Sequence, residues 1–97
     1  MIEQEGQAAP PELARLRADI ERIDRDLIRL IGERVGLARA VGHAKRAADL
    51  PTLDPAREAA VVRRAASLAR DAGLDDSDVR YIFWHLIGLA RRAQLEE

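Results

Sequence analysis

The sequence predicts an all-α protein with three helices, one long and two shorter, and three observations support this fold class. An apolar stripe with alternating three- and four-residue steps runs from Leu13 to Ala44, which is the periodicity of one helix face. Two further segments with helical periodicity follow, separated by residues 51–55 and by Gly73. Apolar residues make up 47% of the 97 residues and aromatic residues only 3%, and much of the apolar content is alanine, which suits closely packed helices.

The long helix is expected to begin at Pro10 or Pro11, because proline is tolerated in a first turn, and to end near Ala48. Residues 1–9 are expected to form a disordered leader, followed by a single helical domain over residues 10–97. The apolar stripe of the long helix consists of Leu13, Leu16, Ile20, Ile23, Leu27, Leu30, Leu37, Val41 and Ala44, interrupted by Arg34. Gly32, Gly36 and Gly42 are expected to allow close approach of another helix or a ligand.

The second helix is expected from Pro55 to about Ala72, with Asp54 as N-cap and Gly73 as C-cap. The third is expected from a cap at Asp75 or Asp76 to about Leu95. The expected apolar faces are Val61, Val62, Ala65, Leu68, Ala69 and Ala72 on the second helix, and Val79, Ile82, Phe83, Leu86, Ile87 and Ala90 on the third.

The unequal helix lengths predict a dimer. A helix of roughly 35 residues is about 50 Å long, and two shorter helices of the same chain cannot cover its whole apolar stripe. An intertwined antiparallel homodimer would cover the remainder. An ordinary coiled coil is the alternative, but two further amphipathic helices favour the bundle.

Charge and composition narrow the function classes. A formal net charge of −1 without a basic stripe argues against nucleic acid and anionic membranes as partners. We expect a cytoplasmic protein, because no signal peptide and no apolar run of membrane-spanning length is evident. Cysteine is absent, His43 and His85 lack metal-ligand spacing, and no phosphate loop or Ser/His/Asp arrangement occurs, so no metal or cofactor is predicted.

Cations at unusual positions of the long helix suggest a site for a small anion. Arg34 and Lys45 are eleven residues apart, so they project from one face about 16 Å apart along the axis and can converge on one ligand. Arg17 lies roughly 25 Å before Arg34 and could reach the partner's site in an antiparallel dimer. Alternatively, Arg17 is solvated, Lys45 favours the helix dipole, and Arg34 snorkels or pairs with Glu33 or Glu58.

Two features of the shorter helices extend this site. Asp54, Arg57 and Glu58 lie at the start of the second helix, where acids are ordinary capping residues but a cation is electrostatically misplaced. A bound carboxylate would explain Arg57. Gln94 occupies an apolar position of the third helix, and a buried amide needs partners, although fraying near the C-terminus is an alternative.

Taken together, the segments LRADIERIDRDLIRLIGERV, AVGHAK, LDPARE and FWHLIGLARRAQ resemble the all-helical, AroQ-type chorismate mutases over about residues 13–95. The resemblance implies an intertwined homodimer with two active sites. It also implies an isomerase of the shikimate pathway of aromatic amino acid biosynthesis, which rearranges chorismate to prephenate. The resemblance further implies that Arg17 enters the active site of the other subunit and that Arg34 binds a substrate carboxylate. It implies that Lys45 and Gln94 contact the ether oxygen.

The resemblance also assigns Asp54, Arg57 and Glu58 to substrate binding, with Glu58 on the C4 hydroxyl. Ala90 stands where many members have serine, which removes a hydrogen bond worth about 0.5–1.5 kcal/mol and predicts lower efficiency or a weaker preference for chorismate. The rearrangement needs no nucleophile, metal or proton shuttle. It needs cations that hold a folded dicarboxylate, and donors aimed at the ether oxygen, where charge grows as the bond breaks.

Three alternatives remain open. The same scaffold hosts mutases acting on 4-amino-4-deoxychorismate, whose C4 amine could pair with Glu58, and isochorismate pyruvate lyases. The presence of Asp54, Arg57 and Glu58 favours a mutase over a lyase. The third alternative is a non-catalytic, dimeric helical interaction module in which Arg34 is salt-bridged.

Overall fold

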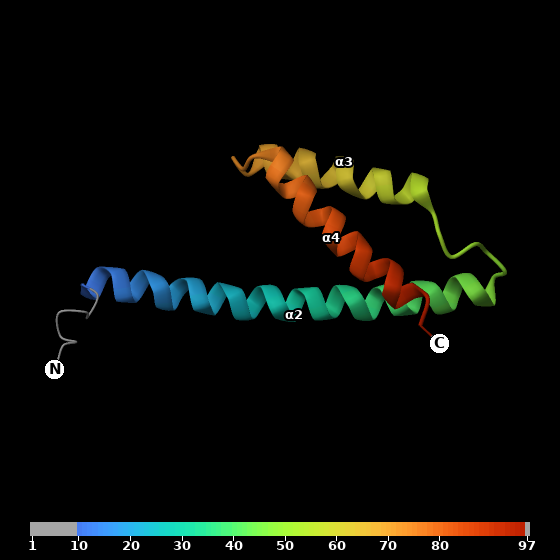
Figure 1. Ribbon diagram of the computed structural model, residues 1–97, viewed down its shortest axis with the longest axis horizontal. Helices are drawn as coiled ribbons and strands as arrows, with labels where there is room; N and C mark the ends of the chain where they lie inside the picture. The colour runs from blue at the N-terminus through green and yellow to red at the C-terminus, as the bar shows by residue number, and fades with distance from the viewer. Residues whose placement is uncertain (1–9, 97) are drawn as a thin grey trace. The chain divides into compact units, whose positions relative to one another are not determined.

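The computed structural model describes residues 10–96, which form three α-helices and no strand (Figure 1). Helix α2 spans Pro11–Ala47, α3 spans Pro55–Asp71 and α4 spans Asp76–Gln94. The predicted all-α class with one long and two shorter helices is confirmed, and every predicted boundary agrees to within one residue. The predicted leader over residues 1–9 lies outside the described residues, and the single domain stays a prediction. Within residues 10–96 no helix combines the length and apolarity needed to cross a membrane.

The N-terminal part of α2, residues 10–31, forms a unit of its own. Its apolar stripe is open to solvent, since Leu16 is 44%, Ile20 57% and Leu27 51% exposed. Arg15 makes ion pairs with neighbours on the same helix, at 2.7 Å to Glu12 and 3.5 Å to Asp19. This part of the helix therefore presents an amphipathic surface whose apolar side is uncovered in the single chain.

Residues 32–96 form the second unit, which contains the buried core. Helices α3 and α4 pack against each other after a short turn, and the C-terminal end of α4 meets α2 at Gly42 (Figure 1). The buried apolar residues are Ala38, Val61, Val62, Ala65, Ala66, Ala69, Ile87 and Ala93. Alanine dominates this set, which lets the helices approach closely.

Capping residues set the ends of these helices. Asp54 and Asp75 cap α3 and α4, each accepting a hydrogen bond from the backbone N–H three residues later at 3.0 Å. Gly73 follows α3 with a φ of 75°, the left-handed conformation that glycine adopts readily. Asp49 has the same role after α2 with a φ of 60°, and the next N–H donates to the Lys45 carbonyl at 2.8 Å. This turn directs the chain back so that Asp54 and Lys45 reach one pocket.

Part of the predicted apolar faces is exposed in the single chain. Leu68 is 58% and Ile82 55% exposed, and Ala72 is also exposed. Ala66 and Ala93 are buried instead. Periodicity identifies a broad apolar arc, and the small alanines in it set which narrower part of the arc faces the neighbouring helix.

Candidate active site

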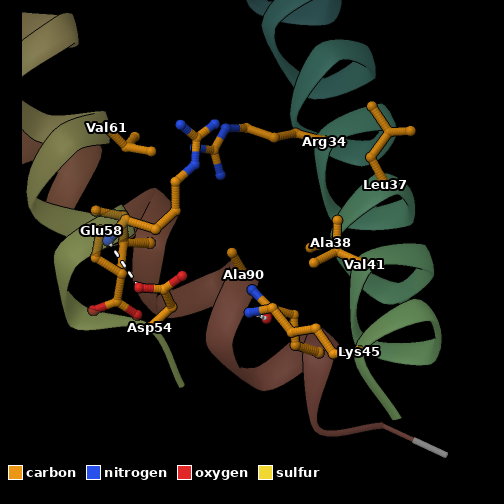
Figure 2. A pocket seen from close by; sticks show the side chains of 12 residues that line it. Arg34, Leu37, Ala38, Val41, Lys45, Asp54, Glu58, Val61 and Ala90 are labelled. Atoms are coloured by element: carbon orange, nitrogen blue, oxygen red, sulfur yellow. Dashed lines mark hydrogen bonds between the residues drawn. The ribbon is translucent and has the colours of Figure 1, made fainter. Parts of the chain in front are cut away.

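Six of the seven residues singled out from the sequence line one pocket of about 470 Å³, a size typical of small-molecule sites. These six are Arg34, Lys45, Asp54, Arg57, Glu58 and Gln94. Leu37, Ala38, Val41, Val61, Ile87 and Ala90 complete the lining. Figure 2 shows Arg34 and Lys45 on α2, Asp54 and Glu58 on the opposite wall at the start of α3, and Ala90 on α4. The pocket thus combines charged groups from three helices with an apolar surface.

Arg34 extends from α2 towards α3 (Figure 2). Its guanidinium carbon lies 5.8 Å from the centre of the Phe83 ring. Burial and the nearby Arg64 lower the pKa of Arg34, so the surroundings oppose its positive charge. Glu58, one of the two acids suggested as its partner, is paired elsewhere, and the residues that the structure describes give Arg34 no carboxylate. An anion bound in the pocket would compensate this cation.

Arg57 lies in the first turn of α3, where its backbone N–H donates to the Asp54 carboxylate at 3.0 Å. Arg57 lines the pocket, and its guanidinium has no hydrogen bond or ion pair within residues 10–96. Because the helix N-terminus is positive, the protein itself does not explain a cation here. Arg57 is therefore a second guanidinium available to a ligand carboxylate.

Lys45 and Gln94 form a polar pair across α2 and α4. The Lys45 Nζ donates to the Gln94 Oε1 at 2.8 Å and to the Thr52 carbonyl at 2.7 Å. The ammonium group has three donors, and the Gln94 amide nitrogen is a further donor. Gln94 is the last residue of α4 and is partly buried. The pair offers adjacent donors to one ligand atom.

Gly42 allows the close approach that holds Gln94. A Cβ atom on Gly42 would fall 2.7 Å from the Gln94 Cα and 2.9 Å from its carbonyl carbon, closer than Cβ atoms come. The Arg46 guanidinium donates to the Gln94 carbonyl at 2.7 Å. The expectation of close approach is confirmed for Gly42, whereas Gly32 and Gly36 meet nothing within 4 Å in the single chain.

Glu58 is held by Arg91, a residue that the sequence reasoning missed. Both carboxylate oxygens accept hydrogen bonds, from the Arg91 Nε at 2.8 Å and from its terminal nitrogen at 2.6 Å. These bonds hold the pKa of Glu58 below its ordinary value, although partial burial opposes the shift. Arg91 lies three residues before Gln94, one helical turn away, and this spacing was the available signal. The sequence reasoning also missed Thr52, whose carbonyl accepts a hydrogen bond from Lys45, and Arg64, whose charge lowers the pKa of Arg34.

Arg17 does not line this pocket. It lies on the N-terminal part of α2 and is exposed. Its predicted place in the site of a second subunit involves a chain beyond this one, so it stays a prediction.

The sequence signature of the family described as chorismate mutase type II matches residues 16–95. The chain is 38% identical over 60 residues to the bifunctional chorismate mutase/prephenate dehydratase of Aquifex aeolicus, covering 62% of this chain and 17% of that protein. It is 34% identical over 76 residues to the chorismate mutase of Methanocaldococcus jannaschii, covering 78% of this chain and 77% of that protein. It is 36% identical over 66 residues to the 4-amino-4-deoxychorismate mutase of Streptomyces venezuelae, covering 68% of this chain and 64% of that protein.

Among solved structures, a conserved hypothetical protein from Pyrococcus furiosus has the same fold, with a TM-score of 0.72 and 30% identity over 89% of this chain and 99% of that one. The matched region is a small fraction of the Aquifex protein, 17%, and most of the Methanocaldococcus protein, 77%. The signature includes every residue of the pocket. The chain therefore belongs to the chorismate mutase type II family, as its resemblance to the all-helical mutases implied.

Proposed function

We propose that the protein is an isomerase that rearranges chorismate to prephenate in this pocket. The observation that carries the proposal is that Arg34 and Arg57, which have no carboxylate partner within residues 10–96, meet the Lys45–Gln94 donor pair in one cavity. Chorismate carries two carboxylates and an ether bridge, so its charges match these groups. The apolar lining provides a surface for its ring.

The proposed mechanism relies on orientation and electrostatics. Arginine forms bidentate hydrogen bonds with carboxylates, so Arg34, Arg57 and Arg17 of the partner subunit would hold the substrate folded. The ether C–O bond then breaks while a C–C bond forms within the same molecule, and no proton leaves or enters. Lys45 and Gln94 would donate to the ether oxygen as negative charge grows there, which stabilises the transition state more than the substrate.

The proposed assembly is an intertwined antiparallel homodimer in which Arg17 completes the site of the other subunit. The exposed stripe on residues 10–31 supports a dimer, because Leu16, Ile20 and Leu27 are each about half exposed in the single chain. A second copy presents the same stripe, so a symmetric arrangement can cover both. An antiparallel pairing places the N-terminal part of one α2 beside the C-terminal part of the other.

The direct test of the activity is the loss of chorismate absorbance when purified protein is added, with prephenate identified as the product. Lys45→Ala should lower the rate on the order of 100-fold or more, because it removes a donor to the ether oxygen. Arg25→Ala, an exposed cation on the same helix, is the matched control and should retain full activity. Wild-type protein that leaves chorismate unchanged would overturn the proposal.

The shared site is tested by mixing subunits. Arg17→Ala and Lys45→Ala proteins are each expected to be inactive, but after joint refolding half of the dimers are mixed and each has one intact site. About a quarter of the wild-type activity should therefore return. Arg22→Ala protein alone, another exposed arginine of α2, should remain active. Absence of any recovery in well-folded mixed dimers would show that Arg17 does not act across the subunits.

A second candidate substrate is 4-amino-4-deoxychorismate. The Streptomyces relative that is named for this substrate is 36% identical to the chain, and the carboxylates of Asp54 and Glu58 line the pocket. Turnover assays with chorismate, 4-amino-4-deoxychorismate and isochorismate distinguish the two mutase activities from a pyruvate lyase.

A further inference from the structure

The pair formed by Glu58 and Arg91 has an unusual placement relative to the pocket. Glu58 lines the pocket and its side chain is 16% exposed, whereas the Arg91 side chain is 50% exposed and does not line it. Arg91 instead lines a small adjoining cavity, which shares five residues with the pocket: Lys45, Asp54, Arg57, Glu58 and Gln94. The guanidinium thus approaches the carboxylate from the side of this adjoining cavity, and the pair joins α3 to α4.

This geometry leaves the Glu58 carboxylate able to accept a hydrogen bond while cancelling its charge. Each oxygen uses one lone pair for Arg91 and retains another, because a carboxylate offers about four acceptor positions. Lys45 and Asp54 also act on Glu58, with opposite effects, and Arg57 lies next to it on α3. A ligand group facing Glu58 therefore meets an acceptor without net negative charge, in a pocket that Arg34 also lines.

We propose that Arg91 is a positioning residue that sets substrate specificity: its side-on pairing with Glu58 selects a neutral hydroxyl donor over an ammonium group. This inference rests on the proposed function, because chorismate and 4-amino-4-deoxychorismate differ only in that group. Their carboxylates are ionised and cannot donate. Glu58 can therefore accept a hydrogen bond only from the hydroxyl of chorismate or from the amine of 4-amino-4-deoxychorismate. An ammonium at this point would face the pocket's cations, while Glu58 is already paired with Arg91 and the Asp54 carboxylate is engaged in capping α3.

The test compares kcat/KM for the two substrates in wild-type protein, Arg91→Gln and the neighbouring control Arg92→Gln. Wild-type protein should prefer chorismate. Arg91→Gln uncovers the Glu58 charge and should shift the preference towards the amino substrate on the order of tenfold or more. Arg92→Gln should leave the preference unchanged, because Arg92 is exposed and lines neither cavity.

Arg91→Lys separates charge from geometry. The ammonium keeps the charge but cannot form the two parallel hydrogen bonds. We expect the preference to stay within about twofold of wild type, since the charge is retained, while kcat/KM for chorismate falls. If Arg91→Gln fails to fold, the wild-type preference and the Arg91→Lys ratio still test the inference.

The outcomes distinguish this inference from the proposed function. Wild-type protein inactive on both substrates would overturn the proposed function. Wild-type protein that prefers the amino substrate, or an Arg91→Gln variant that loses activity on both substrates equally, would overturn the specificity role of Arg91 and leave the mutase reaction intact.

Discussion

Residues 10–31 and residues 32–96 have similar apolar periodicity but bury it to very different extents. Ile20 and Ile23 of the first part are 57% and 48% exposed, whereas Val61, Val62 and Ile87 of the second part are between 4% and 8% exposed. Periodicity shows which side of a helix needs cover, but it does not show what covers it. For Val61, Val62 and Ile87 the cover comes from helices of the same chain, and for the stripe on residues 10–31 we infer that it comes from a second copy.

The ion pairs described in the two regions also differ, in how far apart the paired residues lie along the sequence. Arg15 pairs with acids three and four positions away on its own helix. Arg91 and Glu58 are 33 positions apart, and Arg39 and Glu96, joined at 2.6 Å, are 57 apart. Pairs of the first kind stabilise a helix locally, whereas pairs of the second kind depend on how the helices pack. The functional residues of the pocket are in the part of the chain with long-range pairs.

The largest expected effect is from a charge placed on the exposed stripe. Ile20→Asp should convert the proposed dimer to monomer, because a carboxylate would be buried at the interface and the burial of an isoleucine, worth about 2–3 kcal/mol per chain, would be lost. Sedimentation velocity and urea unfolding measure both consequences.

Ala18→Asp is the matched control, since it adds the same carboxylate within one turn but on the opposite side of α2. It should remain dimeric. Equal behaviour of the two variants would mean that the stripe on residues 10–31 stays exposed in solution.

The next largest effect should occur where α2 meets the end of α4. Gly42→Ala places a Cβ against the Gln94 backbone, so α4 must shift, which we expect to cost about 1–3 kcal/mol. Activity should fall as well, because Gln94 moves with its backbone. Gly36→Ala meets nothing within 4 Å and should instead stabilise the protein by up to about 1 kcal/mol through helix propensity. Thermal unfolding should therefore show a lower midpoint for Gly42→Ala and a higher midpoint for Gly36→Ala than for the wild type.

The sequence predicted the features that depend on local or single-helix geometry. Asp54 and Gly73 mark helix ends through their own backbone and side-chain chemistry. Arg34 and Lys45 share a face because their spacing on one helix is known in advance. The Arg91–Glu58 pair could not be predicted with the same certainty, because it depends on the packing of α3 against α4. The role of Arg17 depends on a second chain, so the sequence alone predicts it with even less certainty.

A smaller effect should appear in the acid stability of residues 32–96. Arg91 lowers the pKa of Glu58 below its ordinary value of 4.5. The folded state is therefore stabilised above pH 4.5, and this contribution is lost as the pH falls through the lowered pKa. Glu58→Gln should show a smaller drop in urea midpoint between pH 6 and pH 3 than wild type. Adding Arg91→Gln to Glu58→Gln should cause little further change, and additive losses would contradict the pairing.

The smallest effect is expected for an ion pair of residues 10–31. Arg15→Gln removes the contacts to Glu12 and Asp19, but Arg15 and Glu12 side chains are 60% and 68% exposed. Exposed pairs of this spacing contribute at most about 0.5 kcal/mol, and salt screens them. The difference from wild type in urea unfolding should therefore be small at low salt and vanish near 1 M salt. A larger loss that persists at 1 M salt would mean that Arg15 contacts another surface, and that residues 10–31 are held by more than an apolar stripe.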